Sequence, residues 1–137
     1  MFALDTDTLT SWLRGQPSIV RRIETQSPRD LAITIITVEE VLGGWYAMIR
    51  QARDDDQLVR SYRWLQQSVE FFRQIRILPL NLSALQRSRA LRKEHRTTGT
   101  NDLRIAAISL ENGVTLVSRN LSDFARIPGL SVESWFE

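Results

Sequence analysis

The chain has no cysteine, a single histidine (His95) and a single lysine (Lys93) among its 137 residues. The lack of cysteine excludes disulfide bonds, thiolate metal sites and cysteine nucleophiles, and is typical of a reducing compartment. One histidine favours neither a zinc site nor a Ser-His-Asp triad. A chain of this length can bury a hydrophobic core large enough for folding without disulfide bonds or a structural metal ion. We therefore expect one domain over residues 1–137.

Long apolar runs are also missing. The longest of them, such as LAITIITV at residues 31–38, are short and interrupted, whereas a membrane-spanning helix needs about 20 apolar residues. The opening residues MFALDTD lack the positively charged leader of a signal peptide. We therefore expect a cytoplasmic protein with no membrane segment.

Arginine supplies nearly all of the positive charge, since Lys93 is the only lysine among 18 basic residues. Guanidinium groups bind phosphates and carboxylates, so this composition is compatible with an RNA or an acidic protein partner, although a biased genome would produce it too. The basic segment 83–96 holds candidate RNA contacts at Arg87, Arg92, Lys93 and Arg96. A solvated helical face explains the same charges, and both interpretations stay open.

Apolar patterning predicts alternating strands and helices. Strands are expected at residues 2–5, 30–37, 76–81, 113–118 and 130–135. Helical spacing appears at residues 6–15, 18–26, 37–52, 57–75 and 83–96, then from Thr100 onward, with a turn or short helix at 119–124. This order predicts an α/β fold with a central parallel sheet of about five strands and helices on both faces. Pro79 suits an edge strand or a strand end.

Acidic residues recur where such a sheet binds its ligands, outside the carboxyl ends of the strands. Asp5 ends the first predicted strand, Glu40 lies in the first helical turn after the second, and Asp102 opens the helix before the fourth. Asn120 and Asp123 follow the fourth strand. A lone acid such as Asp102 is explained by the helix dipole, with Thr100 or Asn101 as the cap. The recurrence of acidic residues at one edge of the sheet instead suggests that they share a function.

Clustered carboxylates need a compensating cation. A pair about 4 Å apart repels by roughly 4 kcal/mol at an effective dielectric constant of about 20, and no lysine lies near these positions in the sequence. Mg²⁺ or Mn²⁺ would supply the charge, because these ions prefer carboxylate and water oxygens. Such ions activate water and stabilise charge on a phosphodiester. The pattern therefore predicts metal-dependent phosphodiester hydrolysis.

The sequence resembles PIN-domain ribonucleases, and among them the toxins of VapBC toxin-antitoxin pairs. The segments FALDTDTL, ITVEEVLGG, TGTNDLRIAA and VTLVSRNLSDFARIPGLSVESW carry the resemblance, in family order over nearly the whole chain. It implies a PIN-like fold and a Mg²⁺- or Mn²⁺-dependent endoribonuclease that acts as a toxin, with tRNA as the expected substrate. It also implies a VapB-like antitoxin that wraps the toxin, and a homodimer.

The resemblance assigns the metal and the catalysis to Asp5, Glu40 and Asp102, with Asp123 helping directly or through water. Glu40 matches, rather than Glu39, because it precedes the segment VLGG. Ser118 is assigned to orienting a ligand. Many relatives carry an aspartate where this chain has Asn120, which weakens the case for a second metal. Asp7 is expected to cap the first helix, and Glu39 to face solvent.

Two other functions stay open. The opening LDTDTLT also resembles haloacid-dehalogenase-like phosphatases, in which two aspartates two residues apart act as nucleophile and acid/base, but that family needs a lysine and a later acidic pair. A catalytically silent PIN-like binding module is the second alternative, in which the acids only cap helices. Among the tryptophans, we expect Trp45 in the core.

Overall fold

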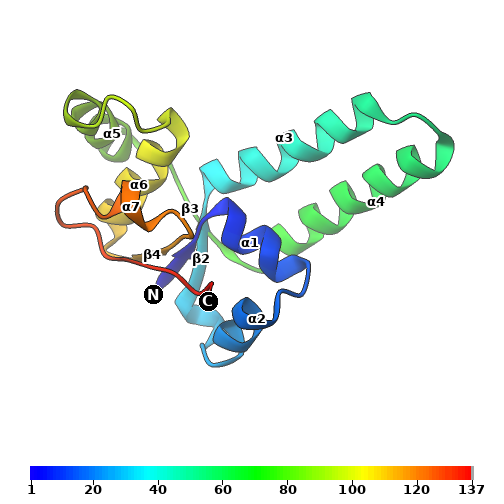
Figure 1. Cartoon of the computed structure of the whole chain (residues 1–137), viewed down its shortest axis with the longest axis horizontal. Helices are drawn as coiled ribbons and strands as arrows, with labels where there is room; N and C mark the ends of the chain where they lie inside the picture. Colours follow the sequence, from blue (N-terminus) through cyan, green and yellow to red (C-terminus); the bar gives the residue numbers. More distant parts are fainter. Residues whose placement is uncertain (137) are drawn as a thin grey trace.

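The structure, a computed structural model, describes residues 1–136. Its strands are β1 (Phe2–Leu4), β2 (Leu31–Thr34), β3 (Arg76–Leu78), β4 (Thr115–Val117) and β5 (Val132–Glu133). Its helices are α1 (Thr6–Leu13), α2 (Pro17–Glu24), α3 (Ile35–Gln51), α4 (Asp55–Phe72), α5 (Leu82–Glu94), α6 (Thr100–Asn112) and α7 (Leu121–Phe124), with a 3₁₀ turn η1 (Pro28–Asp30) (Figure 1). The strand and helix order predicted from the sequence is confirmed.

The strands form one sheet in the order β3-β2-β1-β4-β5, and every neighbouring pair is parallel. The α/β class and the parallel sheet are therefore confirmed. Pro79 directly follows the edge strand β3, as expected for a residue that cannot donate to a neighbouring strand. The chain builds outward from β1 through β2 to β3, then crosses to β4 on the other side of β1. Such a switch between β1 and β4 opens a crevice at their carboxyl ends.

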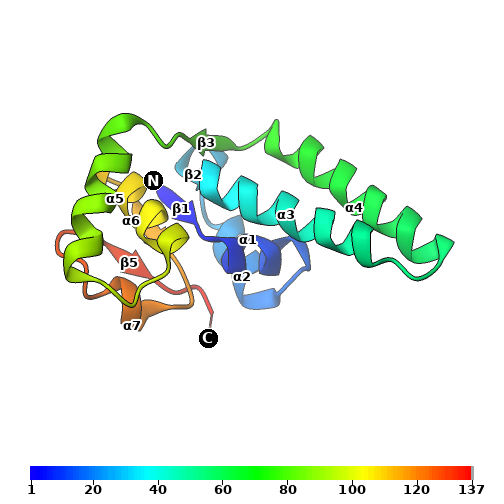
Figure 2. The ribbon, with the colours of Figure 1, turned by 90° about the horizontal axis from the view of Figure 1, so that it is seen from above.

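Successive residues of β1 point to opposite faces of the sheet and pack into the two layers of the core. Ala3 belongs to a buried cluster with residues from α5, α6 and α7, and Leu4 to a second cluster with residues from α1, α2, α3 and α4. Both side chains are fully buried. Figures 1 and 2 show α5 and α6 on one side of the sheet and α1 and α2 on the other. Helices therefore cover both faces, as a parallel sheet requires.

Helices α3 and α4 form an arm that projects beyond the sheet (Figures 1 and 2). The sequence shows an apolar stripe along α4, yet Leu58, Tyr62 and Val69 are 37%, 54% and 46% exposed. The α4 residues that are buried are Ser61, Ser68 and Phe72. Much of the apolar stripe of α4 thus faces outward.

The second strand is shorter than predicted, because the run 30–37 divides between two elements. β2 ends at Thr34, whose Oγ1 accepts a hydrogen bond from the Thr37 amide at 3.2 Å and caps α3. Side-chain capping overrides the strand preference of the β-branched residues that follow. Helix α3 begins at Ile35, so Glu40 lies in its second turn rather than its first. Among residues 1–136, no helix is long and apolar enough to cross a membrane.

Candidate active site

Asp5 begins the site at the carboxyl end of β1. Its amide donates to the Val117 carbonyl at 3.0 Å, which fixes it beside the end of β4. Its Oδ1 accepts from the Thr8 amide at 2.9 Å, so Asp5 caps α1 and the prediction that Asp7 is the cap was wrong. Burial raises the pKa of Asp5, while hydrogen bonds from the Ser118 side chain and the Thr8 amide act in the opposite direction. One carboxylate thus links β1, α1 and β4.

Glu40 enters the site from α3 and is held by two side chains from other helices. Thr6 Oγ1 donates to Glu40 Oε1 at 2.5 Å, and Asn101 Nδ2 donates to Oε2 at 3.4 Å. Glu39 is exposed to solvent, as predicted. The sequence analysis overlooked Thr6 and Asn101, although each is adjacent in the chain to a residue that it singled out. Their positions could have suggested this role.

Asp102 lies in the first turn of α6, which starts at Thr100 after Gly99 as the N-cap, with no side-chain cap. The expected cap by Thr100 or Asn101 is therefore absent. Burial raises the pKa of Asp102, and repulsion from Glu40, Asp5 and Asp123 adds to the effect. A helix N-terminus alone would lower this pKa. The structure thus places the carboxylates predicted from the sequence close enough to repel one another.

Asn120 and Asp123, the residues predicted for the fourth acidic position, lie in a short hydrogen-bonded segment after β4. The Asn120 amide donates to Oγ of the buried Ser118 at 2.9 Å, and Asn120 Nδ2 donates to Asp123 Oδ2 at 2.9 Å. Asn120 and Asp123 therefore act together, because the amide of one orients the carboxylate of the other.

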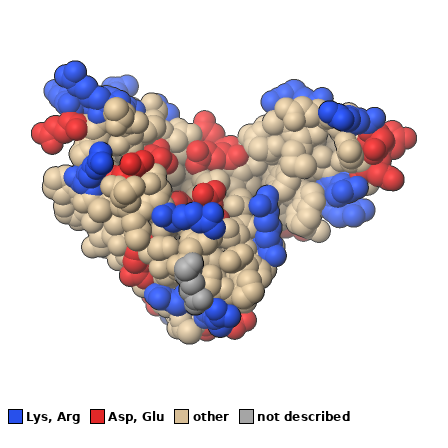
Figure 3. Space-filling view, viewed as in Figure 1, with Lys and Arg blue, Asp and Glu red and all other residues tan. Residues whose placement is uncertain are grey.

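The donor set fits a hard divalent cation that retains bound water. Figure 3 shows acidic side chains at the floor of the notch between two lobes. Within residues 1–136, no arginine or lysine forms an ion pair with Asp5, Glu40, Asp102 or Asp123. In the same described range, no three acidic or histidine side chains converge tightly enough to hold one ion. Mg²⁺ commonly uses one or two carboxylates and completes its shell with water and substrate phosphate, which suits this arrangement.

The basic helix α5 is partly occupied with structural contacts. Arg92 Nη1 donates to the carbonyls of Thr98 at 2.7 Å and of His95 and Arg96 at 3.2 Å each, while Nη2 donates to Thr100 Oγ1 at 3.1 Å. Arg87 forms an ion pair with Glu111 at 3.4 Å. Both guanidinium groups thus have protein partners, and RNA contact by Arg87 and Arg92 stays a prediction. Lys93 and Arg96 are exposed.

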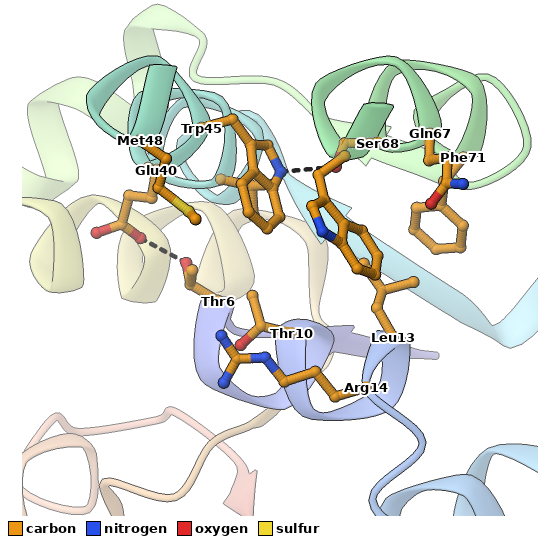
Figure 4. Close-up of a pocket in the computed structure, with 13 residues that line it drawn as sticks. Thr6, Thr10, Leu13, Arg14, Glu40, Trp45, Met48, Gln67, Ser68 and Phe71 are labelled. Carbon is orange, nitrogen blue, oxygen red and sulfur yellow. Dashed lines mark hydrogen bonds between the residues drawn. The ribbon is translucent and has the colours of Figure 1, made fainter. Parts of the chain in front are cut away.

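An apolar groove of about 490 Å³ opens beside Glu40, between α1 and the α3–α4 arm (Figure 4). The stacked rings of Trp45 and Trp64, 5.8 Å apart, line it together with Met48 and Phe71. Trp45 Nε1 donates to Ser68 Oγ at 2.8 Å. Trp45 is thus a half-buried groove residue, and the prediction that it lies in the core was only partly right.

The comparison with known families now decides the classification. A family model, the PIN domain, matches residues 2–130. The chain belongs to the PIN-domain family. Known PIN-domain proteins that it resembles include Ribonuclease VapC1 of Haemophilus influenzae, 26% identical over 137 residues with 98% of each chain covered. It is also 25% identical over 138 residues to the tRNA(fMet)-specific endonuclease VapC of Salmonella typhimurium, covering 98% of this chain and 97% of the relative.

Solved structures agree with this assignment. A toxin-antitoxin complex from Klebsiella pneumoniae has a chain with a TM-score of 0.76 and 26% identity, covering 100% of this chain and 99% of its own. The DNA-bound VapBC of Salmonella typhimurium gives a TM-score of 0.78 at 26% identity, covering 98% and 97%. The PIN fold and the resemblance to VapC proteins are thereby confirmed.

Proposed function

We propose that this PIN-domain protein is a Mg²⁺- or Mn²⁺-dependent endoribonuclease that acts as the toxin of a VapBC-type pair. The observation that carries the proposal is the acidic site itself, where Asp102 is repelled by Glu40, Asp5 and Asp123 and no cationic side chain of residues 1–136 pairs with them. Mutual repulsion of this kind is offset when a divalent ion binds. Capping acids of a silent binding module would not need to converge.

In this proposal Asp5, Glu40 and Asp102 hold the ion directly or through bound water, and Asp123 helps directly or through water. The ion, when bound, supplies an activated water and stabilises the charge that develops on the phosphodiester. Thr6 and Asn101 orient the two oxygens of Glu40 through the hydrogen bonds that they donate. The Ser118 side chain favours the ionised form of Asp5, as a metal ligand requires. The protein thus holds these carboxylate oxygens at fixed positions.

We propose tRNA as the substrate class and the cytoplasm as the place of action. The support is the Salmonella relative, whose name describes cleavage of tRNA(fMet).

The partners that we propose for this chain rest on the solved structures that it resembles. Several similar solved structures are toxin-antitoxin complexes, so we propose a VapB-like antitoxin for this chain. The apolar groove beside Glu40 offers it a docking surface that adjoins the acidic site. We further propose a homodimer through the exposed residues of the arm.

The direct test is incubation of the purified chain with total tRNA in Mg²⁺ or Mn²⁺, followed by mapping of new RNA ends. We expect discrete cuts that EDTA abolishes and that Asp102→Asn reduces by two orders of magnitude or more, about 3 kcal/mol of transition-state stabilisation. Glu40→Gln should behave alike. Glu39→Gln is the matched control, because Glu39 is the exposed neighbour on the same helix.

Equal background cleavage by wild type and Asp102→Asn, with both proteins folded and with total cellular RNA giving the same result, would contradict the proposal and favour a silent binding module. Hydrolysis of p-nitrophenyl phosphate tests the phosphatase alternative. The PIN match over residues 2–130 leads us to expect none.

A further inference from the structure

A second, polar cleft lies on a neighbouring face of α1 and shares Thr10 and Arg14 with the apolar groove, and we call it the arginine cleft. Its volume is about 480 Å³, and its lining includes Asp7, Thr10, Ser11, Arg14, Gln16 and Arg119. Arg14 follows the end of α1, and Arg119 follows Ser118 after β4. Two arginines far apart in the sequence therefore meet at one cleft.

The arginine cleft adjoins the acidic site. Thr10 and Arg14 line both this cleft and the apolar groove, which Glu40 and Thr6 also line. Asp7, Thr10 and Arg14 are spaced by three and four residues and so share one face of α1. Figure 4 shows the Arg14 side chain turned back along α1, with its guanidinium group near Thr10 on the side of Thr6. The charge of Arg14 is thereby directed toward the end of α1 that Asp5 caps.

Both guanidinium groups keep donors available for a ligand. Within residues 1–136, the Arg14 side chain makes no hydrogen bond, ion pair or ring contact. The Arg119 guanidinium carbon lies 3.9 Å from the centre of the Phe136 ring, a stacking contact that fixes the group but leaves the N–H edges free. By contrast, Arg92 and Arg87 are engaged with protein oxygens. Among residues 1–136, Asp7 is the only acid that lines the arginine cleft, so its described lining carries a net positive charge.

We propose that Arg14 and Arg119 bind a backbone phosphate of the RNA substrate, next to the phosphodiester held at the acidic site. The inference rests on the proposed nuclease function and names the residues that receive its substrate. An acidic pocket repels a polyanion, so productive binding needs positive charge beside it. Guanidinium groups suit this task because their planar N–H pairs match phosphate oxygens. This contact is separate from the RNA contacts predicted on helix α5, where Lys93 and Arg96 are exposed.

The test measures RNA binding in the Asp102→Asn protein, where cleavage does not interfere, with labelled total tRNA as the probe. We expect Arg14→Ala to weaken binding about fivefold, and Arg14→Ala with Arg119→Ala to weaken it by more than about tenfold. The slope of log affinity against log salt should fall by about 0.7 to 0.9 in the double variant, since the two arginines together neutralise one backbone phosphate.

The matched control is Arg29→Ala with Arg53→Ala, which removes the same charge from two exposed positions outside the cleft. We expect it to change affinity less than twofold. A loss of binding by Arg14→Ala is also hard to ascribe to misfolding, because the Arg14 side chain makes no hydrogen bond or ion pair with residues 1–136. In the catalytically intact protein, Arg14→Ala should raise KM for tRNA while kcat changes little, which a general structural defect would not produce.

Unchanged affinity and salt slope in the double variant would overturn the inference, and so would an equal loss in the control. Loss of binding to a purified cognate antitoxin, with RNA binding intact, would assign the two arginines to a protein carboxylate instead and overturn it as well. Failure of the nuclease proposal is seen separately, as absence of metal-dependent cuts by the wild-type chain.

Discussion

At the scale of single residues, Asp102 links stability to function. Because its pKa is raised in the folded protein, folding favours the protonated form, so this group's contribution to stability falls as pH rises through the interval between its ordinary and its raised pKa. We therefore predict that Asp102→Asn raises the melting temperature at pH 7 in EDTA. The gain should shrink as the pH falls toward the ordinary pKa of aspartate. Thermal unfolding of both proteins over a pH series measures this.

The control for this prediction is Asp30→Asn, an exposed acid in η1, which should leave the melting temperature nearly unchanged. Saturating Mn²⁺ should raise the melting temperature of the wild-type chain more than that of Asp102→Asn, because the ion binds only the folded site. A variant that is less stable than wild type at pH 7 in EDTA would contradict the raised pKa.

At the scale of elements, the junction between α5 and α6 depends on Arg92. Its guanidinium holds three carbonyls and one hydroxyl of residues 95–100, and α6 with Asp102 starts there. We predict that Arg92→Ala lowers the free energy of unfolding by about 1–3 kcal/mol, because it leaves several acceptors without a charged donor. Urea denaturation measures the loss. Arg96→Ala, an exposed change in the same loop, should cost less than about 0.5 kcal/mol.

Arg92→Ala should also reduce tRNA cleavage more than tRNA binding, because the substitution disturbs the position of Asp102 and leaves the arginine cleft intact. An equal reduction of both would instead indicate that Arg92 contacts the RNA, as the sequence analysis had allowed.

At the scale of the whole molecule, the arm formed by α3 and α4 displays apolar side chains that the chain itself does not cover. Leu58, Tyr62 and Val69 lie on the exposed stripe of α4. We predict that Tyr62→Glu with Val69→Asp converts a dimer to a monomer in sedimentation experiments, because it puts charge into an apolar contact. Arg60→Glu, an exposed change on the opposite face of the same helix, should leave the dimer intact. A wild-type chain that sediments as a monomer at micromolar concentration would contradict the dimer.

The sequence by itself determined the fold class and the edge of the sheet at which the acids lie. Alternating strand and helix patterns require parallel strands, and parallel strands bring the residues that follow them to one edge. Asp5 and Asp102 could therefore be selected from their place relative to the predicted elements, whereas Glu40 was preferred to Glu39 because of the family resemblance. The metal and RNA roles of these residues remain proposals.

Only the tertiary structure decided which arginines are engaged in contacts within the fold. Helical spacing cannot separate Arg92, which reaches the carbonyls of a neighbouring loop, from Arg14, which has no side-chain partner in the described residues. The end of β2 was likewise decided by Thr34, which caps α3 although the β-branched residues that follow favour a strand. The physical reason is common to both cases. Periodicity reports which face of an element is apolar, whereas hydrogen bonds and charge contacts depend on which segments the folded chain brings together.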